Sequence, residues 1–156
     1  MKNAGYFLYL LLLGVWTGGM FMFTFVVTPV IFKSFDRDLA GSIVGRLFPG
    51  YFFFTLVIAA LAAALLFFAW SARAGAAFRA SLVLVVVALL IALYTNFSLH
   101  PRMQSVKQEI ASFERIPPDH ASRQAFRKLH IQGAILNLAL LVDGGALLAL
   151  ATLSRK

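Results

Sequence analysis

The side chains in this chain most able to bind a metal ion or a haem are its histidines. There are three, at positions 100, 120 and 130, and the chain has no cysteine. Neutral imidazole ligates transition metals and haem iron, whereas a cysteine-free chain offers no thiolate ligand and no thiol nucleophile. There is no HxxxH or CxxCH pattern. We take His100 and His130 as candidate metal or haem ligands; a structural role at the membrane surface and general acid–base chemistry are the alternatives.

Two asparagines would lie near these histidines in a helical chain. At about 1.5 Å per residue, Asn96 lies about 6 Å from His100 along the helix axis, and Asn137 about 10 Å from His130. Buried amides in a membrane need partners or water, so they predict a polar pocket at the histidine end. Arg46 could face the propionates of a haem. The candidate ligand-binding residues are Asn96, Asn137, Arg46, Arg102, Tyr51, Trp16 and Asp143.

Asp143 is the only acidic residue between positions 131 and 154. A carboxylate at the bilayer centre costs about 2.5–3.5 kcal/mol on insertion scales, so we expect this one to be protonated. In an antiparallel bundle it would lie near the Trp16 indole N–H and the Thr17 hydroxyl, which we predict as its hydrogen-bond partners. Two roles are open: a structural bond between the first and last spans, or proton or cation coupling during transport.

Long apolar runs must position these residues. The chain has 156 residues, 61% of them hydrophobic, and a mean hydropathy of +0.85. A helix needs about 20 apolar residues to cross a bilayer. We predict an all-α integral membrane protein: an up-down-up-down four-helix bundle with a helical hairpin extending from spans three and four. One transmembrane domain covers residues 1–156, with spans at about 6–32, 51–72, 80–100 and 130–153.

Prolines and charged residues mark the connections between the spans. Pro29 and Pro101 each predict a bend, because proline lacks an N–H group and clashes with the carbonyl four residues earlier. Residues 33–46 predict a short amphipathic helix in the membrane interface, and Pro49-Gly50 should break the chain after it. Residues 73–79 predict a tight turn.

The hairpin is predicted from a helical stripe beyond the third span. Its apolar members are Met103, Val106, Ile110 and Phe113. Helix should therefore continue for about four turns past the membrane, up to a corner at Pro117-Pro118. Asp119 would then cap a return helix over residues 120–130 that leads into the fourth span.

The charge distribution indicates lipid rather than nucleic acid as the partner. The formal net charge is +8, but the charged residues lie at span ends and in short loops, where they face lipid headgroups. The termini and the 73–79 loop hold cations without acids; this density favours both termini in the cytoplasm of a bacterial inner membrane, whereas the raw count of cations favours the reverse. Gly14 and Gly18 form a small-xxx-small pattern, which would suit packing within the bundle or a homo-oligomer.

Several short motifs resemble one family. They are W-T-G-G at 16–19, F-x-F-V-V-x-P at 23–29, A-G at 40–41, G-R-L-F-P-G-Y at 45–51, H-P at 100–101 and K-L-H at 128–130. Together they resemble the transmembrane-protein-205-like family, small four-span proteins of bacteria and eukaryotes with no assigned biochemistry. The resemblance implies a fold and a membrane location but no reaction. The matching positions are Trp16, Gly18, Pro29, Gly45, Arg46, Pro49, Tyr51, His100, Pro101 and His130.

These features favour a membrane binding or transport-type protein rather than an enzyme. Its polar pocket at one end of the bundle would take a metal ion or a haem-like cofactor. One alternative is a structural or assembly protein without a ligand. A second is a membrane enzyme acting on a lipid or quinone, for which the chain lacks a recognisable nucleophile or paired carboxylates.

Overall fold

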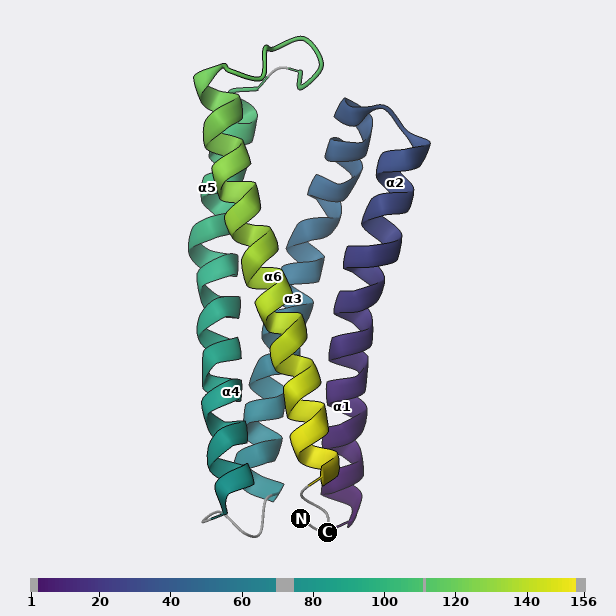
Figure 1. Cartoon of the computed structure of the whole chain (residues 1–156), viewed down its shortest axis with the longest axis vertical. Helices are drawn as coiled ribbons and strands as arrows, with labels where there is room; N and C mark the ends of the chain where they lie inside the picture. The colour runs from purple at the N-terminus through teal and green to yellow at the C-terminus, as the bar shows by residue number, and fades with distance from the viewer. Residues whose placement is uncertain (1–2, 70–74, 111, 154–156) are drawn as a thin grey trace.

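The fold is a bundle of four long helical rods (Figure 1). The computed structural model describes residues 3–69, 75–110 and 112–153, and within these ranges no strand is present. The rods are long and apolar enough to cross a membrane, which confirms the predicted all-helical class; they are Ala4–Ser34, Arg37–Phe67, Ala76–Gln108 and Ala121–Leu153.

The first and third rods are each built from three helical segments, whereas the second and fourth rods are single helices. The first consists of α1 (Asn3–Phe21), the π-helix η1 (Met22–Val27) and α2 (Thr28–Ser34), and the second is α3 (Arg37–Ala69). The third consists of α4 (Ala76–Tyr94), the π-helix η2 (Thr95–Leu99) and α5 (His100–Gln108), and the fourth is α6 (Ala121–Leu153). Neighbouring rods run in opposite directions, and the start of α1 and the end of α6 lie at the same end (Figure 1).

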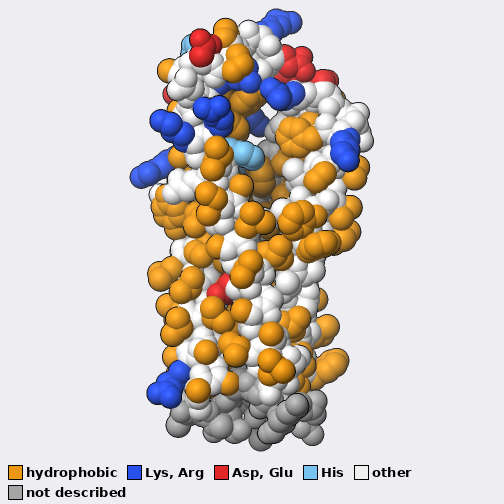
Figure 2. Space-filling model, viewed as in Figure 1, with side chains coloured by type: hydrophobic (Ala, Val, Ile, Leu, Met, Phe, Trp, Pro, Cys, Tyr) orange, Lys and Arg blue, Asp and Glu red, His pale blue; other side chains and the backbone are white. Residues whose placement is uncertain are grey.

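The core of the bundle lies along one face of α1. Tyr9, Leu13, Trp16 and Met20 are fully buried there, at the three- and four-residue spacing of a helix face. The outer surface is also apolar: Phe7 is 67% exposed, and orange side chains cover most of the molecule in Figure 2. Helices that are hydrophobic all round are typical of rods surrounded by lipid.

The second rod corrects one prediction. α3 is continuous from Arg37 through Pro49, so residues 33–46 do not form a separate interfacial helix and Pro49-Gly50 does not break the chain. A proline inside a helix costs about 3 kcal/mol. Ending the helix inside the bilayer would instead leave several backbone N–H and C=O groups without partners, which costs more.

The bends predicted at Pro29 and Pro101 take the form of π-helical turns. Each proline lies just after a π-helix, in the first residues of α2 and α5. The Thr28 N–H donates to the Phe23 carbonyl, five residues earlier, and an equivalent bond closes η2. The wider turn accommodates a residue that would clash with the carbonyl four positions before it.

The hairpin is less helical than its apolar stripe predicts. α5 ends at Gln108, and the described residues between 109 and 120 form turns. His120, rather than Asp119, precedes the first turn of α6: its carbonyl accepts the Gln124 N–H at 3.0 Å, and its Nδ1 lies 2.8 Å from the Ser122 hydroxyl. The predicted end of span two at residue 72 and residues 73–74 of the predicted turn lie outside the described residues. The predicted turn over residues 73–79 is wrong in its second half, because residues 76–79 form the first turn of α4.

Hydrogen bonds between side chains cross the bundle at the level of the π-helices. The Tyr51 hydroxyl donates to Asn137 Oδ1, and Asn137 Nδ2 donates to Thr24 Oγ1 at 2.9 Å. We call Thr24, Tyr51 and Asn137 the polar floor. Beside it, Asn96 Nδ2 donates to the Phe52 carbonyl at 2.9 Å. These bonds join η1, α3 and α6 to one another and η2 to α3.

Replacing the central amide of the polar floor should destabilise the bundle. Asn137→Leu should lower the free energy of unfolding by about 1–2 kcal/mol, because interhelical hydrogen bonds in membranes average about 0.6 kcal/mol and reach about 1.7. Titration of the reconstituted protein with a denaturing detergent measures this. Thr152→Val is the control, because Thr152 bonds only within its own helix. If Tyr51→Phe lowers the free energy of unfolding equally in the Asn137→Leu variant and in the wild type, the hydrogen bond between Tyr51 and Asn137 contributes nothing to stability.

Candidate functional site

A cavity of about 580 Å³ lies at the hairpin end of the bundle, on the aqueous side of the polar floor. This volume is within the usual range of small-molecule sites, about 300–1,000 Å³. Figure 2 shows blue Lys and Arg side chains around a hollow at this end. The residues that line the cavity are Thr28, Phe32, Arg37, Gly41, Val44, Gly45, Phe48, His100, Met103, Gln104, Lys107, Phe113, Pro118, Arg123, Phe126, Arg127 and His130.

The cavity exists because the bundle divides into two pairs of helices at this end. Below the polar floor, α1 packs against both α3 and α6. Above it, α2 packs against η1 and α3 and has no Cα atom within 8 Å of α6, while α5 packs against α6. Figure 1 shows α2 and α6 moving apart toward the hairpin end. The space between the two pairs is the cavity.

Three helical stripes supply the polar lining. His100, Gln104 and Lys107 follow one another on α5 at positions i, i+4 and i+7. Arg123, Arg127 and His130 repeat the same spacing on α6, and Arg37 begins a stripe on α3 that continues through Gly41 and Gly45 to Phe48. Residues at these spacings share one helix face, so each helix presents its stripe to the cavity as a set.

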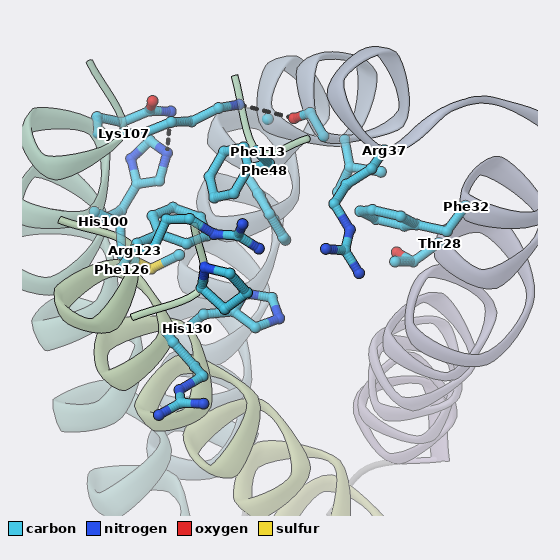
Figure 3. Close-up of a pocket in the computed structure, with 17 residues that line it drawn as sticks. Thr28, Phe32, Arg37, Phe48, His100, Lys107, Phe113, Arg123, Phe126 and His130 are labelled. Carbon is cyan, nitrogen blue, oxygen red and sulfur yellow. Dashed lines mark hydrogen bonds between the residues drawn. The ribbon is translucent and has the colours of Figure 1, made fainter. Parts of the chain in front are cut away.

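The lining carries positive charge without a carboxylate. Arg37, Lys107, Arg123 and Arg127 line the cavity, and among the described residues no Asp or Glu does. Figure 3 shows the guanidinium groups of Arg37 and Arg123 pointing into the same space from α3 and α6. In the described part of the chain, Arg37 and Arg127 make no hydrogen bond or ion pair with the protein. Like charges that face one another repel, and an anion between them would relieve that repulsion.

The other two cations are held by backbone carbonyls. Lys107 Nζ donates to the Gly41 carbonyl of α3 at 2.8 Å, and Arg123 donates through Nη1 to the Ile116 carbonyl (Figure 3 shows the first of these bonds). A Cβ at Gly45 would lie 2.7 Å from Lys107 Nζ, so the absence of a side chain at this position lets the ammonium group reach α3. Because carbonyls neutralise no charge, both cations still act on the cavity.

A loop closes the cavity toward water. We call residues 109–110 and 112–120 the roof loop. Asp38, in the first turn of α3, accepts a hydrogen bond from the Ser112 hydroxyl and one at 2.7 Å from the Phe113 N–H. Phe113 packs edge-on against Phe126 of α6, with ring centroids 5.1 Å apart. One carboxylate therefore holds the roof loop across the cavity.

Both candidate metal ligands line the cavity, in different surroundings. His100 Nε2 lies 3.1 Å from Gln104 Nε2, and its ring packs edge-on against Phe52. The His130 ring stacks on Phe126 at a centroid distance of 6.0 Å. Among the described residues, no group of three or more His, Cys, Asp or Glu could hold a metal ion. The metal site stays a prediction, with His100 and His130 as the only His, Cys, Asp or Glu side chains in the described lining.

The other predicted binding residues lie outside the cavity lining. Asn96, Asn137 and Tyr51 are used in the hydrogen bonds at and beside the polar floor. Arg46 and Arg102 are exposed side chains that do not line the cavity. The structure therefore gives the two amides and the tyrosine a structural role below the cavity.

Asp143 lies far from the cavity, buried in the second half of α6. The predicted hydrogen bonds to it are absent from the described structure: Trp16 Nε1 and Asp143 Oδ2 are both buried without a partner, and the Thr17 hydroxyl donates to the Leu13 carbonyl at 2.7 Å. The neighbourhood was predicted correctly, because a Cβ at Gly144 would meet Thr17 Oγ1 at 3.1 Å. A side-chain hydroxyl in a helix can bond to its own backbone, and here it does so.

The cationic lining residues were missed by the sequence prediction, although the signal was present. Arg123, Arg127 and His130 repeat at helical spacing, as do His100, Gln104 and Lys107. Arg37 could not be placed, because residues 33–46 were expected to form an interfacial helix rather than the first turns of α3.

Comparison with known proteins assigns a family but no activity. A family described as a domain of unknown function (DUF4149) matches residues 11–112, and the chain belongs to this family. The match includes Arg37, His100 and Lys107 and ends before α6, which carries Arg123 and Arg127. No curated protein and no solved structure matches the chain.

Removing the carboxylate that anchors the roof loop should open the cavity to water. Asp38→Ala should speed amide hydrogen exchange in the roof loop, because the variant removes the acceptor of the hydrogen bonds from Ser112 and Phe113 that hold this loop. Exchange measured by mass spectrometry in nanodiscs tests this. Asp119→Ala, an exposed residue of the same loop, is the control. Equal exchange in the two variants would show that Asp38 does not hold the roof loop.

Proposed function

We propose that this member of the DUF4149 family is a membrane binding protein for an anionic amphiphile. The cations of the cavity would hold a phosphate or carboxylate group, and the apolar part of the ligand would lie against the phenylalanines. One observation carries this proposal: four cationic side chains line a partly enclosed cavity to which no carboxylate contributes.

The lining chemistry supports an anion of this kind. Arginine binds phosphate and carboxylate groups through two parallel N–H···O bonds, and such charge-assisted bonds are about twice as strong as neutral ones. Arg37 and Arg127 have no protein partner in the described chain and remain available for these bonds. Four phenylalanines, at positions 32, 48, 113 and 126, supply the aromatic part of the apolar lining.

Other functions have less support from this site. A metal cation would be repelled by the same four cations, and a haem would find only the His130 ring free of protein hydrogen bonds in the described chain. Catalysis by paired carboxylates has no basis in the described lining, which contains no Asp or Glu. Thr28, Lys107 and the two histidines are potential nucleophiles there, but no carboxylate of the described lining orients them. Binding is therefore the function that we propose.

Neutralising two cavity cations should weaken anion binding selectively. Dihexanoyl phosphatidic acid is a soluble probe, and dihexanoyl phosphatidylcholine is its zwitterionic comparison; calorimetry in a neutral detergent measures both. Arg123→Gln with Arg127→Gln should weaken binding of the acid about tenfold or more, because hydrogen bonds to charged groups contribute about 1.5–3 kcal/mol.

The matched control removes two cations from the same end of the molecule but outside the cavity. Arg46→Gln with Arg102→Gln changes the net charge equally and should leave the affinity for the probe unchanged. Equal weakening by the two pairs would show that general electrostatic attraction, and not the cavity, binds the probe. Wild-type protein that prefers neither probe would refute the proposed function.

Two further assignments form part of this proposal. The first is a bacterial inner-membrane location with both termini in the cytoplasm, so that the cavity, at the opposite end of the rods, faces the outer side (Figure 1). The second is a relation to the transmembrane-protein-205-like family, which rests on the motifs given above and adds no reaction.

The proposed orientation can be tested with engineered cysteines, because the chain has none of its own. A cysteine replacing exposed Glu114 should react with a membrane-impermeant maleimide in intact spheroplasts. A cysteine replacing Gly75, between α3 and α4, should react only after the membrane is permeabilised. The opposite labelling pattern would reverse the orientation.

A further inference from the structure

We infer that the ligand is an anionic phospholipid of the surrounding leaflet, which reaches the cavity sideways between α2 and α6. This inference rests on the proposed function, because it names the source of the same anionic ligand. A soluble anion that enters from water is the competing source. The two sources share the phosphate chemistry and differ in the route to the cavity.

The route is a gap in the wall of the bundle, which we call the lateral gap. Thr28 and Phe32 line the cavity from α2, and Phe126 and His130 line it from α6. Figure 3 shows Thr28 and Phe32 facing the cavity from the helix opposite Phe126 and His130. No Cα atom of α2 lies within 8 Å of a Cα atom of α6, and Figure 2 shows a hollow at this end of the bundle.

The lateral gap lies at the depth where a phospholipid has its phosphate and the first part of its acyl chains. From Leu153 to His130, α6 rises about 35 Å, slightly more than the hydrocarbon thickness of about 30 Å. The polar floor, at Asn137, is about 10 Å deeper than His130 and separates the cavity from the middle of the bilayer. The cavity therefore opens sideways at headgroup level and is closed below.

The two ends of the gap suit the two parts of a phospholipid. Arg37, Arg123 and Lys107 lie inside, toward the roof loop, where a phosphate would be held. The outer edge exposes large apolar side chains to the bilayer: Phe32 is 47% exposed and Ile131, next to His130, is 51% exposed. Asp38 and the Lys107–Gly41 bond hold the roof loop and α5 against α3 on the aqueous side. A phospholipid could therefore place its phosphate among the cations while its acyl chains stay in the bilayer beside the apolar side chains.

Photo-crosslinking in vesicles distinguishes the two sources. The protein is reconstituted in phosphatidylcholine vesicles that contain a minor fraction of phosphatidic acid with a diazirine near the headgroup end of one acyl chain. Adducts are mapped by mass spectrometry on the gap segments, residues 28–32 and 126–131, and on residues 93–97. The latter segment is the reference because it is exposed to lipid, with Phe97 73% exposed.

We expect the gap adducts to exceed the reference adducts and to fall about tenfold when unlabelled dioleoyl phosphatidic acid is added, as for a specific site. The reference adducts should not change, and Arg123→Gln with Arg127→Gln should remove the gap adducts while Arg46→Gln with Arg102→Gln keeps them. Gap adducts that are competed no better than the reference would overturn the inference. So would equal competition by inorganic phosphate, because the cavity would then take a free anion from water.

The two levels of the account fail separately. If dihexanoyl phosphatidic acid binds in detergent but the gap adducts behave like the reference, the lipid source is wrong and the proposed function stands. If that probe also fails to bind, the proposed function fails with it.

Discussion

Uncompensated positive charge in a partly enclosed cavity is the constraint on which this account depends. Arg37, Lys107, Arg123 and Arg127 come from three helices, and the lining adds no acid to balance them. Like charges gathered around one space repel one another, and an anion placed between them relieves this repulsion. The chain has a nearby carboxylate, Asp38, but uses it to hold the roof loop. An external anion is the natural partner for these cations.

The membrane explains how the bundle creates this space. Backbone groups in lipid must be paired, so the rods remain helical through their prolines, with π-helical turns in place of breaks before Pro29 and Pro101. Beyond these turns, toward the hairpin end, α2 and α6 diverge. At the level of the turns, hydrogen bonds among Thr24, Asn137 and Tyr51 connect three rods. The same layer thus ends the tightly packed part of the bundle and forms the base of the cavity.

Much of the fold could be predicted from the sequence, because uncharged runs of this length have few alternatives in a bilayer. The four spans, the histidine end and the proximity of Asp143 to Thr17 all follow from counting along helices. The break at Pro49 was wrong, since a helix-breaking residue in water is tolerated when the alternative is unpaired backbone in lipid. The position of Arg37 in the cavity was not predicted for the same reason, because it depends on α3 being continuous.

The sequence and the structure both draw attention to the histidine end of the bundle, but they suggest different ligands for it. Histidines draw attention as metal ligands, whereas stripes of arginine and lysine near a membrane surface are ordinarily assigned to lipid headgroups. Only the packing shows that the stripes of α5 and α6 face a cavity. Asn137 and Asn96 show the opposite case. Their amides suggested a bound ligand, but in the structure they donate hydrogen bonds to Thr24 and to the Phe52 carbonyl.

Native mass spectrometry of the protein extracted from its own membrane in a neutral detergent tests the central claim most directly. The account predicts that the wild-type chain retains an anionic lipid in preference to zwitterionic lipids, and that neutral cavity variants lose this preference. Wild-type protein that retains no lipid, or that retains zwitterionic and anionic lipids in their membrane proportions, would contradict it.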